Sequence, residues 1–151
     1  MPAMKNYHFL SFIFLSIINN VWAQPIVQAE RTIGANTTDL LQSAWLTKDG
    51  GQIIGGYSLS NKSGEKTQHS RGGFDYWVIK LDEYGKITWN RSLGGNSNDL
   101  LFCLQQTTDG GYILGGYSLS KKSGEKSENS RGQHDYWIIK TDSHGRKEWD
   151  K

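Results

Sequence analysis

Short runs of β-branched and aromatic residues, bounded by Gly, Asp, Asn and Ser, dominate the pattern of apolar and polar positions along the chain. Runs of this length and composition are typical of β-strands. No stretch of the sequence sustains the 3.6-residue period of an amphipathic helix. The pattern therefore predicts an all-β protein, and within one unit it predicts strands at residues 75–81, 87–93, 100–106 and 112–119.

The strand pattern occurs twice. Residues 33–91 align with residues 93–151 without a gap, at an offset of about 60 residues and with roughly half of the positions identical, which marks a repeat architecture. Four antiparallel strands per repeat at this period are typical of a β-propeller blade. We expect two four-stranded, propeller-like blades with a partial strand at residues 26–32 before them. Closed propellers need about four to eight blades, so the prediction is an incomplete propeller.

Both faces of the strand at residues 75–81 are mostly apolar. Trp77 and Ile79 lie on one face and Tyr76 and Val78 on the other, so we expect a sheet that is buried on both sides. In the second repeat, the face bearing Trp137 has no third repeat in the chain to cover it. Exposed apolar faces and strand edges favour association, so self-association that completes the propeller is a further prediction.

Turn signals separate the predicted strands. Gly85 and Gly145 stand where a short hairpin loop needs a positive φ. The Asp-Gly-Gly sequences at 49–51 and 109–111 predict hairpins with type I′ turns. The acidic residues that recur in both repeats are therefore interpreted as turn and cap residues.

The N-terminus has the pattern of a secretory signal peptide. Lys5 precedes an apolar run at residues 9–18, and Val21 and Ala23 precede a predicted cut before Gln24. This assigns residues 1–23 to the signal peptide and residues 24–151 to the repeat domain, with a secreted or cell-surface location in the periplasm or outside the cell. The apolar run is short for a membrane span, so no transmembrane segment is expected after cleavage. An uncleaved N-terminal anchor stays open as the alternative.

The net charge and the content of histidine, cysteine and known motifs restrict the classes of function that we expect. The formal net charge is +2, so bulk electrostatics predicts no nucleic-acid partner. No histidine recurs between the repeats, and neither HExxH nor CxxC is present. Cys103 is the only cysteine, so no intrachain disulfide can form. The sequence predicts no catalytic residue, no cofactor and no metal site, and favours a protein that is not an enzyme.

A long polar loop is the most suggestive surface. Residues 61–72 recur as residues 121–132, and in a propeller both loops emerge on the same rim. Their cations could line a groove for an anionic glycan or a surface protein, or the loops could be ordinary solvated connections. The candidate ligand-binding residues are Lys62, Lys66, Arg71, Lys122, Lys126 and Arg131.

The sequences DYWVIKLDEYGKITW at 75–89, LGG at 93–95, ND at 98–99 and QTTDGGYILGGY at 106–117 resemble the secreted β-propeller-type repeats of Bacteroidetes surface proteins. The resemblance implies an exported, non-catalytic repeat module that acts as a scaffold or binding surface at the cell exterior, as part of a larger propeller. The alternative is a fragment of a propeller-type polysaccharide-degrading enzyme or of a glycan-binding protein. A truncated reading frame without an independent role is a third hypothesis.

Overall fold

The computed structural model describes residues 31–151. The predicted signal peptide at 1–23 and most of the predicted strand at 26–32 lie outside the described residues. Arg31 and Thr32, the described part of that strand, are not in a strand.

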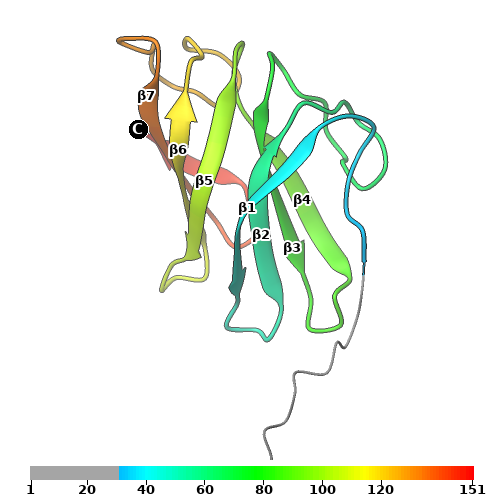
Figure 1. The fold of residues 1–151 in the computed structure, drawn as a ribbon. Coiled ribbons are helices and arrows are strands. Elements are labelled where there is room, and N and C mark those ends of the chain that lie inside the picture. Colours follow the sequence, from blue (N-terminus) through cyan, green and yellow to red (C-terminus); the bar gives the residue numbers. More distant parts are fainter. Residues whose placement is uncertain (1–30) are drawn as a thin grey trace, which may run out of the picture. The chain divides into compact units, whose positions relative to one another are not determined.

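Eight strands form two antiparallel sheets, one from each repeat (Figure 1). Within each sheet the strands follow one another in chain order, because each is joined to the next by a hairpin or by one long loop. The all-β prediction and the prediction of two four-stranded antiparallel sheets are confirmed. The strands are β1 (Asp39–Leu46), β2 (Gln52–Ser58), β3 (Asp75–Leu81), β4 (Ile87–Leu93), β5 (Asp99–Gln106), β6 (Tyr112–Ser118), β7 (Asp135–Thr141) and β8 (Lys147–Asp150).

The hairpins depend on glycine, although not always in the predicted turn type. Gly85 and Gly145 have φ of 77° and 72°, as the sequence predicted. The prediction of type I′ turns at the Asp-Gly-Gly sequences is wrong, because within residues 31–151 only glycines have a positive φ. The first of these turns is instead closed by Gly50 N–H donating to Thr47 O at 3.0 Å, with Gly50 at φ 79°. A three-residue loop that ends in a left-handed glycine has this geometry.

The two sheets pack against each other around one apolar core. Tyr76 and Val78 of β3 point from the first sheet into this core, and Trp137 and Ile139 of β7 point into it from the second. All seven residues of β3 are buried, which confirms that this strand is covered on both faces. The full set of buried core residues is Ile53, Tyr76, Val78, Leu93, Leu101, Leu104, Tyr112, Leu114, Trp137 and Ile139.

The expectation that the face bearing Trp137 is uncovered is wrong. Trp137 and Ile139 are fully buried against the first sheet, whereas Tyr136 is 90% exposed and Ile138 41% exposed. The reason is the direction of stacking, because the second sheet turns its Trp face back toward the first. The first sheet likewise turns its own Trp face, which carries Trp77, away from the second sheet.

Candidate functional site

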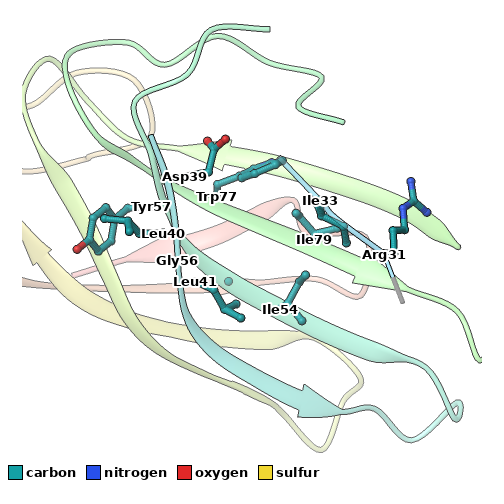
Figure 2. Close-up of a pocket in the computed structure, with 11 residues that line it drawn as sticks. Arg31, Ile33, Asp39, Leu40, Leu41, Ile54, Gly56, Tyr57, Trp77 and Ile79 are labelled. Carbon is teal, nitrogen blue, oxygen red and sulfur yellow. The ribbon is translucent and has the colours of Figure 1, made fainter. Parts of the chain in front are cut away.

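An apolar recess opens on the outer face of the first sheet, the face that carries Trp77 (Figure 2). Its volume is about 250 Å³. Position 56 requires glycine, because a Cβ there would lie 1.8 Å from Leu40 O across the β1–β2 pair. No side chain from this position therefore fills the recess. The recess is lined by Arg31, Ile33, Asp39, Leu40, Leu41, Ile54, Gly55, Gly56, Tyr57, Trp77 and Ile79.

This lining suits an apolar or aromatic group. Trp77 and Ile79 are themselves buried, and Ile33 and Ile54 pack against them, so the floor is already formed. Leu41 stands at the recess with 65% of its surface exposed. The sequence analysis missed this site, although one signal was present. The counterpart of exposed Leu41 in the second repeat is Leu101, and apolar residues at equivalent positions indicate equivalent packing.

The structure distributes the six predicted ligand-binding residues over different environments. Lys62, Lys122 and Arg131 are exposed. Arg71 forms an ion pair with Glu125 across the two loops, with Nη2 to Oε1 at 2.7 Å. The other two, Lys66 and Lys126, are buried.

Lys66 is a structural cation. Its Nζ donates hydrogen bonds to Ser60 O at 2.8 Å, Gln68 O at 3.1 Å and Ser70 Oγ at 3.1 Å, and so holds the loop between β2 and β3 in one conformation. Burial lowers its pKa, and the attraction of Asp75 partly opposes that shift. Lys126 has the corresponding place in the second repeat, with Nζ 5.5 Å from the centre of the Trp137 ring.

Two buried carboxyl groups mark the junction between the repeats. Asp75 accepts a hydrogen bond from Arg71 N–H at 3.0 Å, and Asp99 accepts one from Gly95 N–H at 2.6 Å. Burial raises the pKa of both, that of Asp75 to about 7. Both residues are completely inaccessible to solvent, so a substrate cannot reach them in this state.

The other repeated acids act as turn residues, as the sequence predicted. Asp82 accepts hydrogen bonds from the N–H groups of Tyr84 at 3.0 Å and Lys86 at 2.9 Å. Asp49 pairs with Lys80 Nζ at 2.9 Å. Hydrogen bonds from Thr47 and from Lys80 lower the pKa of Asp49 to about 2. These carboxylates are therefore already engaged in holding hairpins.

Residues 31–151 contain no group of three or more His, Cys, Asp or Glu side chains arranged to hold a metal ion. In the same part of the chain, no helix has the length and apolar character that crossing a membrane requires. No protein-family model matches the chain, and no curated protein matches it at the significance that we required.

Proposed function

We propose that this chain is an exported, non-catalytic repeat module of the β-propeller type, which serves as a scaffold or binding surface at the cell exterior. One observation carries the proposal: several of the polar residues that recur in both repeats are engaged in internal hydrogen bonds, and apolar residues pack one sheet on the next. Asp82 and Lys66 are examples of the first group, and Tyr76 and Trp137 of the second.

The arrangement of the sheets supports the propeller part of the proposal. Each repeat forms a four-stranded antiparallel sheet in simple chain order, and consecutive sheets pack face to face. Repeated sheets of this kind are the units of a β-propeller. The long β2–β3 and β6–β7 loops leave the same end of the two sheets (Figure 1), and both are rich in polar residues. Export is supported by the signal-peptide pattern at residues 1–23.

An activity assay tests the non-catalytic part. The purified chain is incubated with a panel of neutral and anionic polysaccharides, and new reducing ends are counted against a heat-denatured sample. We expect no turnover above that control. Reproducible turnover by the folded chain would overturn the proposal and favour a polysaccharide-degrading enzyme.

A binding assay tests the surface part. We expect the chain to bind polygalacturonate, an anionic polysaccharide, in a salt-dependent way through the exposed loop cations. Replacing Lys62 and Lys122 by Ser should weaken this binding severalfold. Replacing Lys86 and Arg146 by Ser is the matched control, because it removes two exposed cations from the β3–β4 and β7–β8 turns, at the opposite end of the sheets. Equal weakening by the control would show that only net charge matters and that the loops form no binding surface.

A further inference from the structure

The contact between the two sheets is a template for a second contact, which residues 31–151 do not make with one another. In the internal contact, the ring of Tyr76 packs on that of Trp137 with centroids 5.0 Å apart, and its hydroxyl donates to Trp137 O at 3.0 Å. The residues 60 positions away are Tyr136 and Trp77. These two lie on the outer faces of the second and first sheet, respectively.

Three features of the second sheet receive side chains of the first. A Cβ on Gly116 would lie 1.9 Å from Leu100 O within its own sheet and 2.6 Å from the Tyr76 hydroxyl, so the glycine that the strand pair requires also leaves room for this hydroxyl. A Cβ on Gly145 would lie 2.7 Å from the Trp89 ring. At the rim, Glu125 receives Arg71 at 2.7 Å. Each feature joins a receiving residue of the second repeat to a side chain of the first.

The equivalent receiving positions on the first sheet are open. Gly56, the counterpart of Gly116, lies in the recess beside Trp77 (Figure 2). Gly85, the counterpart of Gly145, has no atom of residues 31–151 within 4 Å of its ideal Cβ. Glu65, the counterpart of Glu125, accepts a hydrogen bond from Gly34 N–H at 3.2 Å and lies 3.5 Å from the Arg31 guanidinium, and among residues 31–151 it has no short ion pair like that between Glu125 and Arg71. Leu41 is 65% exposed, whereas its buried counterpart Leu101 has no exposed surface.

The equivalent inserting side chains project from the second sheet. Tyr136, the counterpart of Tyr76, is 90% exposed, and Trp149, the counterpart of Trp89, is 46% exposed. Arg131, the counterpart of Arg71, is exposed and forms no ion pair with any residue of 31–151. The first sheet therefore presents the receiving half of the template, and the second sheet presents the inserting half.

We propose that a second molecule of this chain docks on the recess head to tail. Its Tyr136 fills the recess against Trp77 and Gly56, its Trp149 lies over Gly85, and its Arg131 pairs with Glu65. The proposal deepens the scaffold function proposed above, because it names the partner that the outer sheet faces bind. A head-to-tail contact uses two different surfaces of each molecule, so it leads to a ring if the rotation closes and to a filament if it does not.

Two sequence differences between the repeats should make the contact between molecules weaker than the internal contact. The ring of Trp89 packs on Tyr112 with centroids 5.8 Å apart, whereas Trp149 would meet Gln52, the counterpart of Tyr112. Leu104, buried in the internal core, has Ala44 as its counterpart. Association also costs translational and rotational freedom that the covalently linked repeats do not lose. We therefore expect an equilibrium that depends on concentration in the micromolar range.

Sedimentation of the full chain tests this contact with two variants. Tyr136→Arg blocks the inserting face, and Leu41→Arg blocks the receiving face. Both side chains are exposed, so the variants should fold, which far-ultraviolet circular dichroism checks. We expect the unaltered chain to associate and each variant alone to be monomeric. Mixed in equal amounts, the two variants should form a dimer and stop there, because each supplies one intact face.

Trp45→Arg is the matched control. Trp45 is 54% exposed, and its counterpart Gln105 is exposed beside the internal contact, so this position lies outside the template. The control should associate like the unaltered chain. A monomeric unaltered chain would overturn the proposal, as would association that neither Tyr136→Arg nor Leu41→Arg reduces, which would assign it to another surface.

Two further results separate this inference from the function above. Should Tyr136→Arg fail to fold, Arg131→Glu replaces it as the inserting-face variant, since it reverses one exposed charge at the rim and should also reduce association. Failure of the mixed variants to form a dimer would overturn the head-to-tail geometry. None of these outcomes bears on the turnover assay, so the two proposals fail independently.

Discussion

The pKa of the Asp75 carboxyl group depends on where the fold places this residue. It lies at the start of β3, where it is inaccessible to solvent and accepts a hydrogen bond from Arg71 N–H. Burial raises its pKa to about 7, the charge of Asp99 adds to that shift, and Arg71 and Lys66 oppose it. The protonated form of Asp75 is therefore the form that the folded state favours.

This pKa makes the stability depend on pH. The folded state binds more protons at this site than the unfolded chain does between about pH 4 and pH 7. The free energy of unfolding should therefore fall as the pH rises through this range. Asp75→Asn should make the profile flatter, although Asp99, whose pKa is also raised, keeps part of the slope. Thermal melting from pH 4 to pH 8 measures this. Unchanged slopes in Asp75→Asn would contradict the assignment.

The long loop between β2 and β3 is an ordered element, because a buried cation fixes it. Lys66 Nζ donates to three oxygen atoms of the loop. Asn90 of β4 adds further contacts, since its Oδ1 accepts a hydrogen bond from Thr67 N–H at 3.1 Å. The exposed part of the loop, including Lys62, is thus carried on a fixed base.

We expect Lys66→Ala to destabilise the protein by about 1–3 kcal/mol or more, because it leaves buried acceptors without a donor. Lys62→Ala, at an exposed position of the same loop, should change the stability by about 0.5 kcal/mol or less. Urea unfolding of both variants measures the difference. Equal effects would show that the loop does not depend on the buried amine.

At the scale of the whole molecule, the contact between the sheets joins the two repeats into one core. Trp137 is the largest side chain in that core without exposed surface. It contacts Tyr76 across the sheets, and its indole N–H donates to Asp150 Oδ2 at 3.0 Å within its own sheet. The stability of each sheet is therefore linked to that of the other.

Trp137→Ala should cost about 3–5 kcal/mol, as expected for a large buried aromatic residue. The cavity that this substitution leaves lies between the two sheets. We therefore expect one cooperative unfolding transition at a lower denaturant concentration, seen equally by circular dichroism and by tryptophan fluorescence. Trp149→Ala, which removes a half-exposed tryptophan from the adjacent strand, is the control and should cost less. Comparable losses in the two variants would contradict the burial of Trp137.

Much of the fold could be predicted from the sequence because its signals are local. Runs of β-branched and aromatic residues between turn signals predicted the observed bounds of β3 and β4, and Gly85 and Gly145 marked hairpins through a backbone conformation that favours glycine. The candidate site was predicted less well. Lys66 and Lys62 look alike in a polar loop, and only the folding of the loop back over β2 places the first inside and the second outside.

The sequence by itself determined the strands, the turns and the two-fold repetition, since each depends on neighbours close in the chain. The tertiary structure alone decided which face of each sheet is covered, because both faces of β3 and β7 carry apolar residues and the pattern is the same in either direction of stacking. That decision buried Trp137 and exposed Tyr136, because the second sheet packs its Trp face on the first, and it left the recess beside Trp77 on the opposite face of the first sheet.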